Sequence, residues 1–230
     1  MHNPLVSCII PVWNGEKYLE EAIQSVLDQT YLKLEIVVVD DGSTDRTANI
    51  ISSFEGRLIS IHQEQAGPAA ARNSGIEASQ GEFVAFLDAD DIWEPTKTEL
   101  QVERLLSREE RSICLCKVKN FWSPEIARTN RQFPMEESEP ISGWFAQSMM
   151  VRSHAFDSIG LFDISLRHRE AMEWLRRATD SGLLVDVIEQ VLVRRRGHLT
   201  NRSRSRAEDD HKALLKIAQD AVLRRRSKGA

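Results

Sequence analysis

Cysteine is scarce in this chain of 230 residues, and long apolar runs are absent. The three cysteines, Cys8, Cys114 and Cys116, include one C-x-C pair but lack the second pair that a structural zinc site needs. We therefore expect reduced thiols. No apolar segment approaches the roughly 18 residues of a membrane span, and no basic start leads into a short apolar segment. These absences predict a cytoplasmic protein that does not cross a membrane.

Glycine-rich phosphate loops are missing as well. Neither G-x-G-x-x-G nor G-x-x-x-x-G-K-[ST] occurs, which argues against a dinucleotide-binding domain of the usual type and against a P-loop protein. A nucleotidyltransferase is disfavoured for a similar reason, because the segment after the first apolar run reads "PVWNGEKY" and is not glycine-rich. Any phosphate-bearing ligand must therefore be held by other groups.

Positive charge is in deficit overall but concentrated near the end of the sequence. The formal net charge of −5 argues against general nucleic-acid binding. Arginines nevertheless crowd positions 194–206 and 224–226. A basic end of this kind is either a solvated surface or a contact with anions or lipid headgroups. Peripheral contact with the inner face of a membrane is thus one of two interpretations.

Apolar runs alternate with amphipathic segments along the first half. The runs rich in β-branched residues predict strands, and helical spacing of apolar residues predicts the segments between them. We expect strands within 5–13, 34–45, 57–64 and 82–91, and helices within 16–29, 45–54 and 67–81, the second capped by Ser43 or Thr44. This alternation predicts an α/β fold whose mainly parallel sheet is flanked by helices on both faces.

The second half is less regular. Helices are expected over 95–107 and 170–181 and strands over 112–122 and 183–195, while the polar, proline-containing segment 123–143 is typical of a loop. An amphipathic helix is expected from 207 to about 226, where core packing, a lipid surface or a dimer contact would use its apolar stripe. Without repeats or a clear linker, one domain over 1–230 is the simplest division.

Carboxylates follow two of the predicted strands. In a parallel α/β sheet, ligands bind outside the carboxyl ends of the strands, so two neighbouring strand ends would bring these acids into one crevice. They are Asp40, Asp41, Asp88, Asp90 and Asp91. Their mutual repulsion requires compensation, and a hard divalent cation such as Mg²⁺ or Mn²⁺ provides it while sharing its coordination with substrate phosphates. Asp45, in contrast, is as readily explained as a helix or turn cap.

Four motifs follow one another along the sequence: P-x-x-N at Pro11–Asn14, D-D-G-S-x-D at Asp40–Asp45, G-x-x-x-A-R-N-x-G at Gly67–Gly75, and D-x-D at Asp88–Asp90. In this order they resemble the family-2 glycosyltransferases of the GT-A fold. Each motif alone is weak, but their order over some 80 residues is specific. The resemblance covers most of the chain. It implies a Rossmann-like mixed sheet, with residues 1–107 binding a nucleotide sugar, 108–206 binding the acceptor, and 207–230 forming a C-terminal helix.

The resemblance implies roles on the donor side. The nucleotide base and ribose would be held near the end of the first strand and by the second motif, with Arg72 near the sugar or diphosphate and the D-x-D residues at the ribose and metal. The residues implied for nucleotide-sugar binding are Pro11, Val12, Asn14, Asp40, Asp41, Arg72, Asp88, Ala89, Arg196 and His198, and those implied for the metal, Mn²⁺ or Mg²⁺, are Asp88 and Asp90. Arg196 and His198 come from a basic motif that would meet the diphosphate. We expect His198 to act as a hydrogen-bond donor rather than a metal ligand, and Arg194 and Arg195 to lie on the strand surface.

The acceptor side departs from the family pattern. The usual Glu-Asp pair supplies an Asp as catalytic base, but here Glu170 is followed by Ala171. Glu170 is the first candidate for the base and Glu173 the second, since residues three apart share a helix face. The alternative for Glu173 is an ion pair with Arg176 or Arg177. By the same resemblance, Arg152, Phe156, Gly160, Phe162 and Asp163 would shape the acceptor site.

The sequence thus predicts an inverting glycosyltransferase that moves a hexose or N-acetylhexosamine from a nucleotide sugar, commonly a UDP-sugar, to an acceptor hydroxyl. The acceptor could be a carbohydrate, a lipid-linked compound or a small molecule, in polysaccharide synthesis or small-molecule glycosylation. The alternative is a catalytically impaired module that only binds the nucleotide sugar, because the usual base position holds Ala171.

Overall fold

The computed structural model describes residues 3–108, 112–129, 138–166 and 168–198, together with 214, 216 and 217. Most of the helix predicted over 207–230 lies outside these residues, as does the middle of the segment 123–143. The architecture below is that of the described residues.

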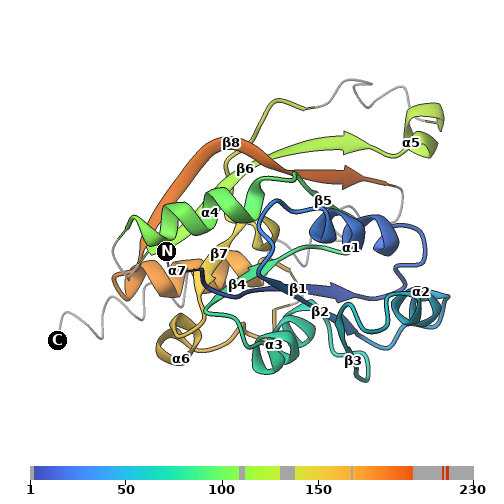
Figure 1. The fold of residues 1–230 in the computed structure, drawn as a ribbon, viewed down its shortest axis with the longest axis horizontal. Coiled ribbons are helices and arrows are strands. Elements are labelled where there is room, and N and C mark those ends of the chain that lie inside the picture. Colours follow the sequence, from blue (N-terminus) through green and yellow to red (C-terminus); the bar gives the residue numbers. More distant parts are fainter. Residues whose placement is uncertain are drawn as a thin grey trace.

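A mixed sheet of eight strands runs through the centre of the described chain, in the order β3-β2-β1-β4-β7-β6-β8-β5 (Figure 1). The strands are β1 (Val6–Val12), β2 (Leu34–Asp40), β3 (Ile59–His62), β4 (Phe83–Phe86), β5 (Ile92–Trp93), β6 (Ser112–Trp122), β7 (Met150–Arg152) and β8 (Leu184–Gly197). Pairing is parallel from β3 to β4 and between β6 and β8, and antiparallel where β7 and β5 join. The predicted α/β class with a mixed, mainly parallel sheet is confirmed.

Helices cover both faces of the sheet (Figure 1). They are α1 (Leu19–Leu27), α2 (Thr47–Ser53), α3 (Pro68–Ala78), α4 (Lys97–Leu106), α5 (Pro124–Thr129), η1 (Ala146–Ser148), α6 (Ala155–Ile159) and α7 (Glu170–Asp180). Helices α1, α2 and α4 pack on one face, and α3, α6 and α7 on the other. Along β1, Ile10 belongs to the first apolar cluster and Ile9 to the second. Because helices cover both faces of the sheet, side chains on both sides of the parallel strands β1 and β4 are buried. This explains why the sequences of these strands are continuous apolar runs.

Helix α3 lies very close to β1, and glycine makes this possible. A Cβ added at Gly75 would lie 2.4 Å from Cγ2 of Ile9. The helix begins at Pro68 and follows Gly67, whose φ of +97° is a conformation that glycine adopts at little cost. These constraints fix where Arg72 in the middle of α3 is placed.

Four local expectations were wrong. The carboxylates were expected to follow two neighbouring strands. Strand β1 instead lies between β2 and β4, so the acids that follow β2 and β4 lie on either side of the end of β1. The two-residue strand β5 was missed, and α5 forms inside the segment expected to be a loop. Neither Ser43 nor Thr44 caps α2. Instead the N–H of Thr47 donates to Oδ1 of Asp45 at 2.9 Å, as the capping interpretation of Asp45 predicts.

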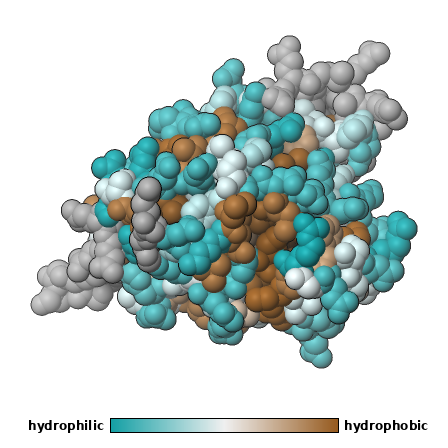
Figure 2. Space-filling model, in the orientation of Figure 1, coloured by the Kyte–Doolittle hydropathy of each residue, from teal (hydrophilic) through white to brown (hydrophobic). Residues whose placement is uncertain are grey.

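The face of the molecule shown in Figure 2 is hydrophilic around most of its rim, and apolar surface gathers near its middle. Leu32, in the turn between α1 and β2, is 91% exposed and is the most exposed large apolar side chain of the described residues. Within those residues, no helix combines the length and apolar character that crossing a bilayer requires.

Candidate active site

A cavity of about 910 Å³ opens beside the carboxyl ends of β1 and β4. Its walls come from the β1–α1 loop, the segment after β4, η1 with the residues before it, the start of α7 and the end of β8. The predicted site residues that line it are Pro11, Val12, Asn14, Asp41, Arg72, Asp88, Ala89, Asp90, Glu170, Arg196 and His198. Asp40 and Glu173 are not among the lining residues. The fold thus brings residues from both halves of the chain to one place.

The β1–α1 loop is braced by the loop after β2. The N–H of Asn14 donates to Oγ of Ser43 at 2.9 Å, and the N–H of Thr44 donates to Oδ1 of Asn14 at 2.8 Å. Asn14 has a positive φ of 52°, which asparagine tolerates better than most residues. The neighbouring Trp13 is 47% exposed and lines the cavity. Sequence reasoning missed Trp13, although an exposed aromatic ring beside a predicted nucleotide site suggests base stacking.

Asp40 and Asp41 have different surroundings. Asp40 is buried, accepts a bond from the N–H of Ser43 at 2.9 Å, and lies 3.2 Å from Nδ1 of His62. The structure therefore gives Asp40 a role in holding the loop, away from the cavity. Asp41 accepts from Gln63 and from the N–H groups of residues 66 and 67, at 2.7 to 2.9 Å. A carboxylate has about four acceptor positions, so Asp41 can still accept one bond from a ligand.

A buried guanidinium joins the two halves of the site. Arg72 is 4% exposed; its Nη1 donates to Oε1 of Glu170, and its Nη2 donates to Oδ1 of Asp88 at 2.5 Å. Burial would lower the pKa of Arg72, but the charges of Asp88 and Glu170 raise it above its usual value. Burial, together with the nearby Asp90 and Glu170, raises the pKa of Asp88, while Arg72 opposes this shift. Arg72 therefore links a strand end of the first half to the first turn of α7.

Asp90 and His198 form the second ionisable pair of the cavity. His198 Nε2 lies 2.8 Å from Oδ2 of Asp90, and the imidazole packs against the ring of Tyr18, with the ring centres 4.9 Å apart and the planes tilted by 45°. We expected His198 to act as a hydrogen-bond donor rather than a metal ligand, but its position beside a carboxylate of the D-x-D segment makes it a candidate metal ligand as well. An imidazole nitrogen and a carboxylate at this distance form a suitable donor pair for a divalent cation.

Asp91 is a support for the cavity wall. It is 2% exposed and accepts from the N–H of Arg196 at 2.9 Å and from Nε2 of Gln147 at 3.1 Å. Burial, reinforced by the charges of Asp90 and Asp88, raises its pKa well above the usual range. Asp91 thereby connects the D-x-D segment to η1 and to β8.

Arg196 is already engaged within the protein. Its Nη2 donates to Oε2 of Glu21 at 2.5 Å, its Nε donates to the carbonyl of Asp90 at 3.0 Å, and its Cζ lies 4.7 Å from the centre of the Tyr18 ring. Arg195, which we expected on the strand surface, instead lines the cavity. The expectation for Arg195 was wrong because β8 ends at the cavity and so exposes residues of both its faces there.

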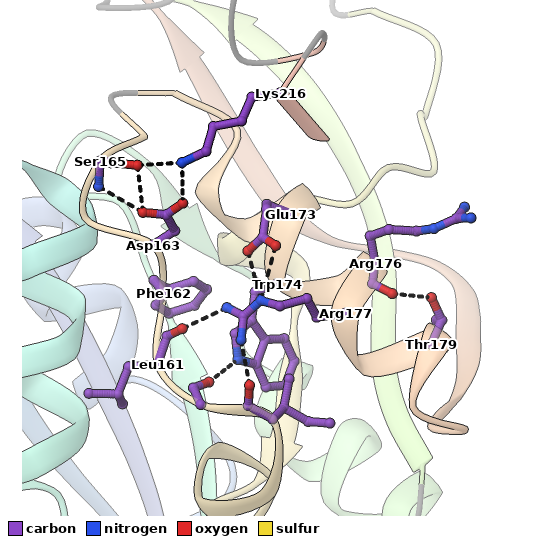
Figure 3. Close-up of polar contacts among 12 residues, drawn as sticks. Leu161, Phe162, Asp163, Ser165, Glu173, Trp174, Arg176, Arg177, Thr179 and Lys216 are labelled. Atoms are coloured by element: carbon purple, nitrogen blue, oxygen red, sulfur yellow. Dashed lines mark hydrogen bonds and ion pairs between the residues drawn. The ribbon is translucent and has the colours of Figure 1, made fainter. Parts of the chain in front are cut away.

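Glu173 is part of a structural cluster behind the site (Figure 3). Both of its carboxylate oxygens accept from Nε of Arg177, at 3.0 and 2.9 Å. Arg177 also donates to the carbonyls of Ile159 and Leu161, at 2.5 and 2.6 Å. The alternative of an ion pair with Arg177 is therefore correct, although Glu173 is buried and Arg177 only partly exposed. Glu170, at the start of α7, lines the cavity, whereas Glu173 points to the loop after α6.

The comparisons with known proteins agree with this geometry. The model for glycosyl transferase family 2 matches residues 7–172. The chain belongs to glycosyl transferase family 2. An uncharacterized glycosyltransferase of Rickettsia typhi is 33% identical over 214 residues, which are 86% of this chain and 65% of that one. The putative teichuronic acid biosynthesis glycosyltransferase TuaG of Bacillus subtilis is 44% identical over 109 residues, 46% of this chain and 43% of TuaG.

Solved structures show the same fold. TarS of S. aureus, residues 1–349 with UDP, has a TM-score of 0.69 and 22% identity, covering 93% of this chain and 64% of that one. The same protein with UDP-GlcNAc has a TM-score of 0.70 and 22% identity, covering 87% of this chain and 61% of that one. The GT-A fold expected from the sequence is thus confirmed. The family-2 chain described here spans less than two thirds of the length of these relatives.

The five residues expected to shape the acceptor site of this family-2 chain do not line the cavity. Phe156 and Phe162 lie in the apolar cluster with Trp174, whose Nε1 donates to the carbonyl of Gly160 at 2.7 Å. Asp163 accepts from Lys216 Nζ at 2.6 Å and from Ser165 (Figure 3), and Arg152 donates to Glu82 and Leu105. The cavity wall on this side is formed by Trp144–Gln147 and His168–Met172.

The donor set of the cavity suits a divalent cation. Asp88 and Asp90 offer carboxylate oxygens, which Mn²⁺ and Mg²⁺ prefer, and His198 offers an imidazole nitrogen, which Mn²⁺ accepts more readily than the harder Mg²⁺. Among the described residues, however, no three His, Cys, Asp or Glu side chains already converge as a metal cluster. A cation here would therefore complete its coordination with water or with ligand phosphates.

Proposed function

We propose that this chain is the catalytic domain of an inverting glycosyltransferase that moves a sugar from a nucleotide sugar, with UDP as the nucleotide, to an acceptor hydroxyl. The observation that supports this most is the position of Glu170, on the wall of the cavity that Asp88 and Asp90 also line. UDP and UDP-GlcNAc occur in the structures of TarS, which shares the fold. A proton acceptor and a diphosphate site in one cavity are the two groups that this reaction needs.

On the donor side, Asp88, Asp90 and His198 would hold Mn²⁺ or Mg²⁺. Such a cation, when bound, neutralises charge on the departing nucleoside diphosphate. The ring of Trp13 is placed to stack on the base, and Asp41 has an acceptor position left for the nucleoside. Asp91, Gln147 and the backbone of β8 keep the D-x-D segment in place before the donor arrives.

On the acceptor side, Glu170 would take the proton of the attacking hydroxyl. The bond from that oxygen to the anomeric carbon forms while the bond from the anomeric carbon to the diphosphate oxygen breaks, which inverts the configuration. Arg72 holds the Glu170 carboxylate in a fixed direction by bonding its Oε1, and leaves Oε2 available to the acceptor. Orientation of this kind is a usual contribution to catalysis.

The surroundings of Ala171 favour an active enzyme over a binding module. Ala171 belongs to the apolar cluster formed with Phe156 and Trp174. Ala171 also lines the cavity, but so does the neighbouring Glu170, whose carboxylate meets Arg72 there, so the cavity has a proton acceptor without an acid at position 171. A missing acid at 171 is therefore weak evidence for loss of activity.

The experiment is a donor-hydrolysis and transfer assay. The protein would be incubated with a panel of nucleotide sugars and with Mn²⁺, Mg²⁺ or EDTA, and release of free nucleotide would be followed. We expect slow, metal-dependent release of UDP, lost in Asp90→Asn. A protein that shows no release with any donor, and no change in melting temperature on adding UDP and Mn²⁺, would contradict the proposal.

The predicted cytoplasmic location and the contact of residues 207–230 with a membrane surface rest on the sequence alone. The identity of the acceptor is likewise a matter for the transfer assay, in which carbohydrate, lipid-linked and small-molecule acceptors would be compared.

A further inference from the structure

The last residues of β8 direct their arginines to opposite sides. Arg194 and Arg196 lie on one side, with their Cζ atoms 4.6 and 4.5 Å from the centre of the Phe121 ring. Arg195 lies on the other, with its Cζ 5.5 Å from the centre of the Phe145 ring. This is the alternation expected of a strand. Arg196 and, after the strand end, His198 meet Asp90, so Arg195 projects from the opposite face of β8.

The guanidinium of Arg195 has no hydrogen-bond acceptor and no ion-pair partner among the described residues. It lies near enough to Asp91 for its charge to lower the pKa of that carboxyl. The oxygens of Asp91, however, accept from the N–H of Arg196 and from Gln147. Arg196 has the reverse situation, since Glu21 and the carbonyl of Asp90 occupy its donors. A half-buried guanidinium with unused donors is costly unless a ligand or water satisfies it.

Arg195 shares its part of the cavity with aromatic side chains. Phe145 and its neighbour Trp144, both half-buried, line the same cavity, as do His168 and Met172 of the segment 168–172, which contains the start of α7. Nε2 of His168 is buried and lacks a hydrogen-bond partner among the described residues. Aromatic rings with a few polar groups form a typical ligand wall. Because Glu170 belongs to the same segment as His168, this wall is the acceptor side of the reaction proposed above.

We infer that Arg195 binds an anionic group of the acceptor, a carboxylate or a phosphate, so that the acceptor is an acidic saccharide or a phosphate-bearing compound. The inference rests on the proposed function, because it takes the η1 and α7 wall as the acceptor side. The donor diphosphate would be met by the cation that Asp90 and His198 hold, on the other face of β8. An arginine held by ring stacking presents its fork of donors to a carboxylate or phosphate with little loss of side-chain entropy.

The test uses two pairs of sugars that differ mainly in charge. Methyl glucuronide is compared with methyl glucoside, and glucose 6-phosphate with glucose, by calorimetric titration in saturating UDP and Mn²⁺ so that the diphosphate site is filled. We expect the charged member of at least one pair to bind about tenfold more tightly. Arg195→Gln should abolish this preference, Arg195→Lys should keep part of it, and the control Arg194→Gln should leave it unchanged.

Each other outcome counts against the inference. Equal binding of both members of each pair, or binding of neither, would contradict it. So would an Arg195→Gln variant that binds UDP about tenfold more weakly and keeps the charge preference, because Arg195 would then serve the donor diphosphate. Thermal melting curves identify any variant that does not fold. If Arg195→Gln does not fold, the charge preference of Arg195→Lys is compared with that of the wild type instead. Metal-dependent UDP release by the wild-type protein, measured first, separates a failure of this inference from a failure of the proposed function.

Discussion

The two sides of the cavity hold their charged groups by different means. On the side of β1 and β2, the carboxylates of Asp40, Asp41 and Asp45 accept bonds from backbone N–H groups of the surrounding loops. On the side of α7 and β8, Arg72, Arg195 and Arg196 are held by carboxylates or by aromatic rings. Backbone bonds fix the first side whether or not a ligand is present. The second side depends on side-chain pairs, so single substitutions there should have larger and more specific effects.

The largest effect is expected at the start of α7. Glu170→Gln removes the proton acceptor and should reduce transfer by a factor of about 100 or more, because general-base catalysis typically contributes this much. Donor binding, measured by titration with UDP and Mn²⁺, should change little. Glu173→Gln is the matched control one helical turn away, and it should leave turnover within about threefold per folded molecule. If both variants lose activity equally, Glu170 has no special role.

A large loss of stability is expected behind the site. Arg177→Met removes the guanidinium that donates to both oxygens of the buried Glu173 and should lower the free energy of unfolding by about 3 to 5 kcal/mol. Denaturant unfolding measures this change. The control Arg176→Met breaks only the pair with Asp180, at 3.3 Å and one turn along the helix, and should cost about 0.3 to 0.5 kcal/mol. The double variant Glu173→Gln with Arg177→Met should recover part of the loss, and no recovery would mean that the buried charge is not the cause.

A smaller loss is expected on the first side of the cavity. Gly75→Ala places a methyl group 2.4 Å from Cγ2 of Ile9 and should cost about 1 to 3 kcal/mol through overpacking between α3 and β1. Thermal and denaturant melting measure it. Adding Ile9→Ala, which removes Cγ2 of Ile9, should reduce the penalty of Gly75→Ala. If the second substitution only adds its own loss, the close approach is not responsible.

The smallest effect is a pH dependence at Asp163. Burial would raise the pKa of this carboxyl, but the hydrogen bonds from Lys216 and Ser165 lower it from 3.8 to about 2. A depressed pKa stabilises the folded state fully above the unfolded pKa, and this stabilisation is lost as the pH falls through the folded one. The contribution should therefore fade between pH 4 and 2 in the wild type. In Asp163→Asn it should be missing, and equal acid sensitivity of the two proteins in unfolding experiments would contradict this.

The donor side could be predicted well because its signals are local. Strands β1, β2 and β6 were found from their apolar runs, and β6 matches its predicted range of 112–122. The cavity does collect Asp88, Asp90 and Arg72, since motif residues lie at strand ends or on the helix packed against them. Strand order could not be predicted in the same way, and the insertion of β1 between β2 and β4 depends on pairing of distant segments.

The acceptor side was predicted less well for a physical reason. Period two along β8 implies that Arg195 and Arg196 point in opposite directions, but the sequence does not tell which direction faces the cavity. The sequence likewise does not tell which of Glu170 and Glu173 faces the cavity, because both lie in the first turn of α7. Residues 152–163 were expected to contact the acceptor, but Phe156 and Phe162 of this segment pack in the apolar core.

Two adjacent residues of α3 have a consequence for protein engineering. Arg72 contacts Glu170, and Asn73 exchanges two hydrogen bonds with the backbone of Phe162, at 2.9 and 3.0 Å. Both partners come from the later half of the chain. A chimaera that takes its nucleotide half from one relative and its acceptor half from another would therefore have to transplant these contacts together. Recombination between the halves of such enzymes should succeed only where both parents keep a matching arginine, asparagine and acid.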